Sequence, residues 1–176
     1  MSPASSTDLS RPSSRQDMLR DMARHIRNPA MGTGTLASLR RGSAHDVTRQ
    51  AAFHRLLADL PDYEIQPYDL IRWAAVAQCM ALTGVSARQG ASDGTVLAHA
   101  ALSESRFSRL LASHGDGFRD QLLFVARYLH SKDASLGWND LGELTLTDDA
   151  DEERADTLRL QLARDYYRSL ATGSAT

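Results

Sequence analysis

The segment from Tyr68 to Leu82 constrains the fold more than any other part of the chain, because it is apolar almost all round. Its apolar residues include Leu70, Ile71, Trp73, Ala74, Val76, Ala77 and Met80. A helix that is apolar on every side has to be surrounded by other parts of the protein. Pro67 stands at a first-turn position and opens this helix. We therefore expect it at the centre of a helical bundle.

Amphipathic segments on both sides of this helix predict the elements that surround it. In residues 15–27, apolar side chains recur at i, i+3, i+4 and i+7, the spacing of one helix face. Further helices are expected at 35–41, 43–60, from 96 onward, 103–113, 116–130, 138–144 and from about 148 to 170. The helix at 43–60 is expected to start with Ser43 and Asp46 and to end at Pro61. With only five prolines and strong helix formers throughout, the chain is predicted to be all-α, a helical bundle of about seven to eight helices.

The chain length bounds the domain organisation. At 176 residues it forms one domain or two small lobes that share a core. We expect a single all-α domain at 15–172, with lobes at 15–83 and 96–172 joined by a glycine-rich loop at 84–95. Residues 1–14 are rich in serine, proline and threonine, lack the apolar segment of a signal peptide, and are expected to form a disordered tail.

Composition places the protein in the cytoplasm. The single cysteine, Cys79, rules out an internal disulfide and suits a reducing cytosol. It lies within an apolar run, so we interpret it as a small buried side chain rather than a nucleophile. No apolar stretch reaches the ~20 residues that a membrane helix needs, so no membrane association is expected.

Positive charge is concentrated in the first three quarters of the chain. Through Lys132 there are 16 basic and 12 acidic residues, a net charge of 16 − 12 = +4. From Asp133 onward there are 4 basic and 10 acidic residues, a net charge of 4 − 10 = −6. Nineteen of the twenty basic residues are arginines, whose planar fork of donors matches phosphate. A GC-rich genome would also raise the arginine content, but it would not sort the charge.

Several of these cations are expected on adjacent helices, where they predict a groove that binds a nucleic-acid backbone. The candidate residues are Arg40, Arg41, Arg106, Arg109, Arg119, Arg127 and Lys132. The alternative for each of them is an ordinary solvated surface charge. A further stripe on the first helix consists of Arg20, Arg24 and Arg27, and its role stays open.

Catalytic and metal-binding patterns are missing from the sequence. The six histidines are scattered, and none shares a helix face with another histidine, an aspartate or the cysteine at ligand spacing. We interpret the acidic run at 148–153 as the start of the final helix, where the helix dipole stabilises carboxylates, rather than as a metal site. The chain is therefore expected not to be an enzyme and to hold no cofactor or metal.

Two blocks of sequence, taken in order, resemble a known family. The first is GTLASLRRG at 34–42, followed by AAFHRLL at 51–57. The second is ALSESRFSRLL at 101–111, followed by ARYL at 126–129 and GWNDL at 137–141. Each motif is common by itself, but their order, their spacing and the total length are similar to those of the CasB family, the small subunit of the type I-E CRISPR Cascade complex. The resemblance runs from about residue 34 to 167.

The resemblance implies an all-α protein without catalytic activity. Two copies would lie head to tail in the complex, in contact with its backbone and large subunits, and would help to hold the crRNA, the target DNA strand and the displaced strand of the R-loop. Arg40 and Arg41 match the paired arginines of the family, and Arg106 matches the arginine of its "SERR" block. Arg109, Arg119, Arg127 and Lys132 lie where the family is commonly basic.

The chain departs from the family pattern in two places. Ser105 stands where a second arginine is usual, and the segment after Trp138 lacks a second tryptophan and is unusually acidic. The arginine stripe of the first helix has no secure counterpart in the family.

Two other functions stay open on the sequence. One is a helix-turn-helix DNA-binding transcription regulator, formed by residues 103–130 with a turn that contains Gly115. The other is a structural adaptor, a helix bundle whose arginines only keep it soluble. Sequence-independent nucleic-acid binding distinguishes the small-subunit hypothesis from both.

Overall fold

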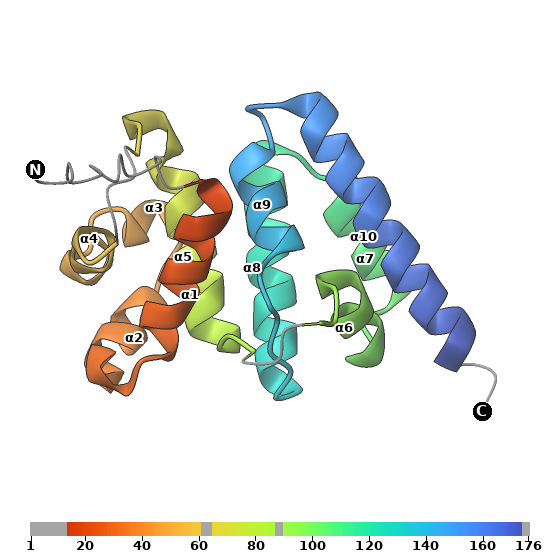
Figure 1. The fold of residues 1–176 in the computed structure, drawn as a ribbon, viewed down its shortest axis with the longest axis horizontal. Coiled ribbons are helices and arrows are strands. Elements are labelled where there is room, and N and C mark those ends of the chain that lie inside the picture. The colour runs from red at the N-terminus through yellow and green to blue at the C-terminus, as the bar shows by residue number, and fades with distance from the viewer. Residues whose placement is uncertain (1–13, 61–64, 87–89, 174–176) are drawn as a thin grey trace, which may run out of the picture.

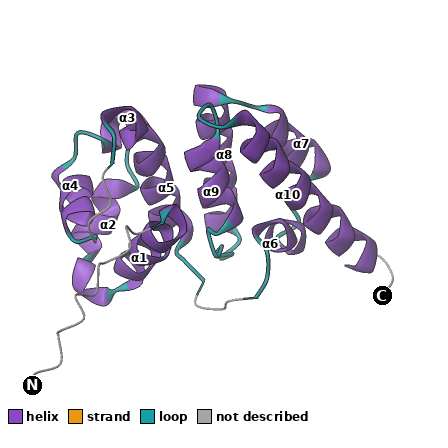
Figure 2. Ribbon diagram, turned by 45° about the horizontal axis from the view of Figure 1, so that its top comes forward, coloured by secondary structure: helices purple, strands orange, loops and turns teal. Residues whose placement is uncertain are grey.

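The computed structural model describes residues 14–60, 65–86 and 90–173. Over these residues the chain is helical, and its one pairing of extended backbone is an isolated parallel bridge between Val85 and Leu136. The predicted all-α class is therefore confirmed (Figure 1 and Figure 2). The expected tail at 1–14 falls almost entirely outside the described residues, as does Pro61, the expected end of one helix.

The described residues form ten α-helices and two short 3-10 helices rather than seven or eight helices. The first five α-helices are α1 (Arg15–Arg27), α2 (Thr33–Leu39), α3 (Ala44–Val47), α4 (Ala51–Ala58) and α5 (Leu70–Thr83). The others are α6 (Asp93–His99), α7 (Glu104–Ala112), α8 (Gly115–Ser131), α9 (Asp140–Thr147) and α10 (Glu152–Gly173). The 3-10 helices are η1 (Pro29–Met31) and η2 (Pro67–Asp69).

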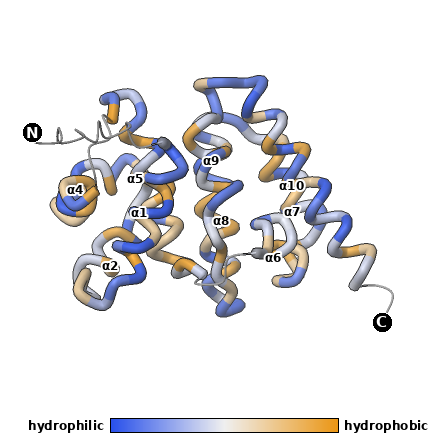
Figure 3. The backbone as a smooth tube through the Cα atoms, viewed as in Figure 1, coloured by the Kyte–Doolittle hydropathy of each residue, from blue (hydrophilic) through white to orange (hydrophobic). Residues whose placement is uncertain are grey.

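Helix α5 is enclosed by other helices, as its sequence predicts, since it packs against α1, α2, α3, α8 and α9. Residues 73–82 are all buried. In Figure 1, α1 to α4 lie with α5 on one side, α8 and α9 lie in the middle, and α6, α7 and α10 lie on the other side. One hydrophobic cluster includes residues of all three groups, among them Phe53, Trp73 and Tyr166. Hydrophilic residues dominate the connection between α9 and α10, at the edge of this arrangement (Figure 3).

The single helix expected at 43–60 is in fact two helices, α3 and α4. The expected start is correct, because Ser43 and Asp46 form a reciprocal capping box. The break comes at Gln50, whose backbone is extended and which begins α4. The Gln50 side chain accepts a hydrogen bond from Ser38 Oγ at 2.9 Å. Tertiary hydrogen bonding therefore fixes a kink that the apolar pattern alone does not reveal.

The expected loop at 84–95 is shorter than predicted, because α6 begins at Asp93 and not at residue 96. Ser92 caps this helix by accepting a hydrogen bond from the Thr95 backbone N–H. The predicted loop includes Gly94, but this residue lies in the first turn of α6. A Cβ atom at Gly94 would meet the Leu162 carbonyl oxygen at 2.5 Å, so the glycine permits the close contact of α6 with α10.

Asp93 holds the segment that leads into α9. Its buried carboxylate accepts backbone N–H bonds from Trp138 at 3.1 Å, Asp140 at 3.0 Å and Leu141 at 2.9 Å. Trp138 has a left-handed backbone conformation, with φ of 61°. The helix expected at 138–144 therefore begins at Asp140 instead, and Asp93 satisfies N–H groups at its start.

In the part of the chain that the structure describes, no helix has both the length and the apolar character that a membrane span requires.

Replacing Asp93 by asparagine is expected to lower the free energy of unfolding by about 1–3 kcal/mol. An amide group offers one acceptor oxygen in place of two, which leaves at least one of the three N–H groups without an acceptor. Urea titration followed by circular dichroism measures the difference. The matched control is Asp120→Asn on the exposed surface of α8, which should change stability by less than about 0.5 kcal/mol. Equal effects of both substitutions would contradict the anchoring role.

Asp93 also gives folding stability a pH dependence. Burial, partly offset by the backbone hydrogen bond from Leu141, raises the pKa of Asp93 from 3.8 to about 6. A raised pKa means that Asp93 binds its proton more tightly in the folded state than in the unfolded state. The stability gained from this proton is complete below the pKa of the unfolded state. We expect it to be lost as pH rises from about 4 to 6, and the loss to be absent in Asp93→Asn. Unfolding titrations of both proteins between pH 4 and 7 test this, and parallel pH profiles would refute it.

Candidate nucleic-acid interface

Arg40 and Arg41 follow α2 and are attached to the C-terminal half of α5. Arg40 Nε donates a hydrogen bond to the Ala81 carbonyl at 2.7 Å and so satisfies one of the carbonyls that a helix end leaves free. The buried Gln78 amide donates to the carbonyl of Gly42 at 3.0 Å and lies 3.5 Å from that of Arg41. Both arginines are exposed. The Arg41 guanidinium, among the described residues, has no hydrogen-bond or ion-pair partner.

Arg127 on α8 approaches the same turn of α5. Burial raises the pKa of Cys79 to about 12, and the positive charge of Arg127 is close enough to oppose this increase. Cys79 is therefore a protonated core residue, as expected, and no thiolate forms there at neutral pH. Arg127 itself is exposed. Arg40 and Arg127 thus lie near residues 79–81 of α5, and the backbone of Arg41 lies near Gln78; we call Arg40, Arg41 and Arg127 the α5 patch.

Arg106 and Lys132 lie beside two aromatic rings of α8. The Arg106 guanidinium carbon is 5.5 Å from the ring centroid of Phe124 and 5.2 Å from that of Tyr128. Lys132 Nζ is 5.7 Å from the Tyr128 ring. These are cation–π distances. The Tyr128 hydroxyl is 3.0 Å from the Ala100 carbonyl and 2.9 Å from that of Ala101, which holds the ring in place. We call these four side chains the α7–α8 cluster.

The two groups of cations meet on α8. Arg127 comes three residues after Phe124, and residues at this spacing are neighbours on a helix surface. Phe124 is 48% exposed and separates the α5 patch from Arg106. Arg109 lies one turn beyond Arg106 on α7 and is also exposed. Six of the seven predicted residues therefore present exposed cationic side chains, and α8 links the two groups.

Arg119 is the exception among the predicted residues. Its side chain is only 13% exposed and donates a hydrogen bond to Asp116 at 2.7 Å. This hydrogen bond is the largest cause that lowers the pKa of Asp116. Because the guanidinium is packed and paired with a carboxylate, it presents little charge to the surface. The sequence placed it among the surface cations because Arg119 lies outside the main apolar stripe of α8.

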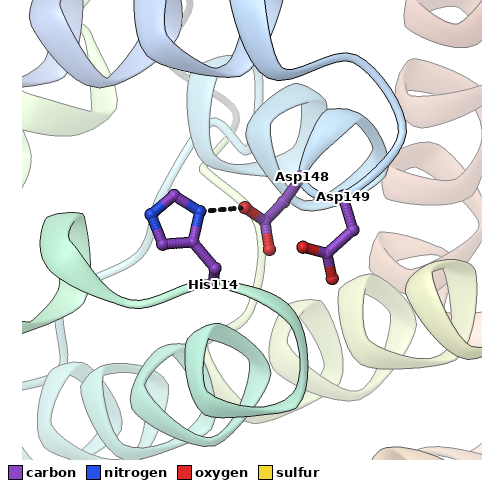
Figure 4. A group of neighbouring side chains, drawn as sticks. All are labelled: His114, Asp148 and Asp149. Atoms are coloured by element: carbon purple, nitrogen blue, oxygen red, sulfur yellow. Dashed lines mark ion pairs between the residues drawn. The ribbon is translucent and has the colours of Figure 1, made fainter.

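A second cluster of charged groups is not predicted by the sequence. His114, Asp148 and Asp149 come together beside the start of α8, with one potential ligand atom from each within 4.8 Å of the others (Figure 4). They line a cavity of about 440 Å³ together with Arg159. No local spacing could have revealed this group, because 33 residues separate the α8 start from Asp148.

Arg159 already supplies a positive charge to this cluster. Its Nη2 atom donates to Asp148 Oδ1 and lies 3.2 Å from His114 Nδ1. The other Asp148 oxygen accepts the Gly115 backbone N–H at 2.7 Å. Asp148 is 1% exposed, and its two oxygens are both used. The cluster is therefore a buried ion pair that attaches the start of α8 to α10, and a metal ion would have to displace Arg159.

The acidic run thus differs from its expected role as a simple helix start. Asp151 does cap α10, since its carboxylate accepts the Arg154 backbone N–H at 3.0 Å. Asp148, by contrast, precedes the helix and forms the buried ion pair. The run contributes one capping group and one core charge.

Comparisons with known proteins agree with the sequence resemblance. The family of CRISPR-associated protein Cse2 matches residues 35–167. The crystal structure of M. ruber CasB superposes with a TM-score of 0.66 at 22% identity, covering 92% of this chain and 97% of that one. CasB from Thermobifida fusca superposes with a TM-score of 0.63 at 13% identity, covering 86% and 97%. A search of curated protein sequences found no match.

At these identities the two structures show that the chain has the CasB fold. The family match covers more than half of the chain and includes all seven predicted cations, from Arg40 to Lys132. The chain therefore belongs to the CRISPR-associated Cse2 family.

Proposed function

We propose that the chain is the non-catalytic small subunit of a type I-E CRISPR Cascade complex and that it binds nucleic-acid backbone without reading sequence. Its ligands would be the crRNA, the target DNA strand and the displaced strand. Membership of the Cse2 family supports this place in the complex. The observation that supports the binding role is that Arg40, Arg41 and Arg127 are all exposed, come from separate elements and lie beside the C-terminal half of α5.

The physical requirement on such a subunit is modest. Pairing between guide and target supplies the sequence specificity, and strand exchange during R-loop formation is nearly balanced in free energy. A few contacts from arginine to phosphate are then enough to favour the opened state. They release condensed counterions and are the same for every sequence. The α5 patch and the α7–α8 cluster provide such contacts on exposed surfaces.

Partners in the complex would be its backbone and large subunits and a second copy of the chain, in the cytoplasm. The acidic segment at 148–153 is unsuited to nucleic acid, because carboxylates repel phosphates. It would face away from the strands or dock against a basic neighbour.

The geometry of α8 supports this proposal over a helix-turn-helix regulator. In such a regulator the first residues of the second helix contact base edges in the major groove. Here the first turn of α8 carries Asp116, and Asp149 lies beside it, both exposed. Two exposed carboxylates at this end would repel the phosphates that flank a groove. The opposite face of α8 is buried against α5.

The isolated protein is expected to bind single-stranded oligonucleotides weakly, and about tenfold or more weakly at 200 mM than at 50 mM salt. Oligonucleotides of unrelated sequence should bind equally. Fluorescence anisotropy titrations at several salt concentrations measure both properties. A defined sequence preference would instead favour the regulator, and absence of binding together with stable protein partners would favour the adaptor.

Charge reversal in the α5 patch is expected to weaken retention of target DNA by the assembled complex. We choose Arg41→Glu with Arg127→Glu, because Arg40 also holds the end of α5 and its loss would disturb folding. The slope of log affinity against log salt should become shallower by about 1–2. Arg164→Glu with Arg168→Glu, on the exposed face of α10, is the matched control. Retention and slope equal to those of this control would exclude the patch from binding.

A further inference from the structure

A groove lies beside the residues that follow α5 and those that precede α9. Two adjoining cavities, of about 330 and 650 Å³, share Val85, Ser86 and Gly137 in their walls. Ser86 donates its backbone N–H to the Leu136 carbonyl at 2.8 Å, so the shared wall is fixed by backbone pairing. We call the two cavities together the junction groove.

Positive charge lines both ends of the junction groove. At one end are Arg20, Arg24 and Arg27, the stripe on α1. At the other end is Lys132, with His99 beside it and Asp133 as an opposing charge. The side chains of Arg20 and Arg24 are 57% and 72% exposed. The groove therefore joins two sets of accessible cations from opposite parts of the fold.

The arginines of α1 form at most weak ion pairs with other described side chains. Arg20 pairs with Asp17 and Arg24 pairs with Asp21, each three residues earlier on the same helix. Exposed pairs of this kind contribute about 0–1 kcal/mol, so a phosphate can compete for the guanidinium. Arg27, among the described residues, has no recorded ion-pair partner.

The arrangement suits a linear polyanion. Arg20 and Arg27 are seven residues apart, which is about 10 Å along a helix, and Lys132 extends the charge to the other side of the junction. Guanidinium groups bind phosphate oxygens through paired N–H donors. Trp138 in the lining is 1% exposed and offers no face for a base, so among the described lining residues His99 is the one exposed aromatic ring. With three arginines and a lysine against this single ring, the lining favours contact with the backbone of a strand.

We propose that the junction groove binds the phosphate backbone of one nucleic-acid strand, with Arg20, Arg24 and Arg27 at one end and Lys132 at the other. It is a second contact, separate from the α5 patch. The stripe on α1 lies outside residues 35–167, the part of the chain that matches the family. The inference rests on the proposed function, because it assigns a further strand contact to a protein that binds nucleic acid.

The chain offers a direct probe of this groove, because Lys132 is its single lysine. An amine-acylating reagent modifies Lys132 and the N-terminal amine, and mass spectrometry of proteolytic peptides separates the two. A single-stranded oligonucleotide at saturating concentration is expected to slow acylation of Lys132 in the full-length protein at least threefold. The N-terminal amine serves as the internal reference.

The variant Arg20→Gln/Arg24→Gln/Arg27→Gln tests the other end of the groove. It should lose most of the protection at Lys132 and show a salt slope shallower by about 2, since each lost phosphate contact on a single strand removes about 0.7. The α5 patch is intact in this variant, so weaker binding at low salt persists. The control is Arg164→Gln/Arg168→Gln on α10, which should retain full protection.

The outcomes separate this inference from the proposed function. If the wild-type protein binds the oligonucleotide but Lys132 is acylated equally with and without it, the groove is not the site; Lys132 then also drops out of the α7–α8 cluster, and the proposed function stands on the α5 patch and the remaining arginines. If no oligonucleotide binds at any salt concentration, both proposals fail. Equal protection by inorganic phosphate at the same phosphate concentration, or by poly-glutamate at the same charge, would overturn the assignment to a nucleic-acid strand.

Discussion

The carboxylate of Asp93 is the interaction on which the C-terminal part of the fold depends. It is buried, and it accepts three backbone N–H groups from a segment about 45 residues away. The segment includes Trp138, whose indole N–H donates to Thr83 at the end of α5 at 3.2 Å. One carboxylate thus fixes α6, the start of α9 and the end of α5 relative to one another. Asp93 therefore also fixes one wall of the junction groove, because Gly137 in that wall precedes Trp138 in the same segment.

Buried polar groups also position the cations of the candidate interface. The Gln78 amide, inside an otherwise apolar helix, reaches the carbonyls at the end of α2 and holds that turn against α5. Burying an amide is costly unless its hydrogen bonds are satisfied. Here the satisfied amide orients Arg41, while Arg40 completes the end of α5. The core and the candidate binding surface are therefore parts of one hydrogen-bond arrangement.

Arginine serves two distinct purposes in this molecule. Arg119 and Arg159 are packed and paired with carboxylates, Arg119 within α8, and Arg159 with the buried Asp148 that also binds the start of α8. Arg41 and Arg127 are exposed and carry no recorded ion pair among the described residues. The high arginine content alone does not distinguish these roles, because the same side chain suits a buried ion pair and a phosphate contact. Only the positions of the acidic groups separate them.

The sequence by itself determined the all-α class, the burial of α5 and most of the helix positions, because helical periodicity is a local property of the chain. It also determined which cations were candidates, through the sorting of charge along the chain. The split of the helix at Gln50, the attachment of Asp93 to the start of α9 and the ion pair of Asp148 with Arg159 were decided by tertiary structure. Each depends on groups brought together from distant positions, and the free energy of a buried hydrogen bond or ion pair exists only once the surrounding helices have excluded water.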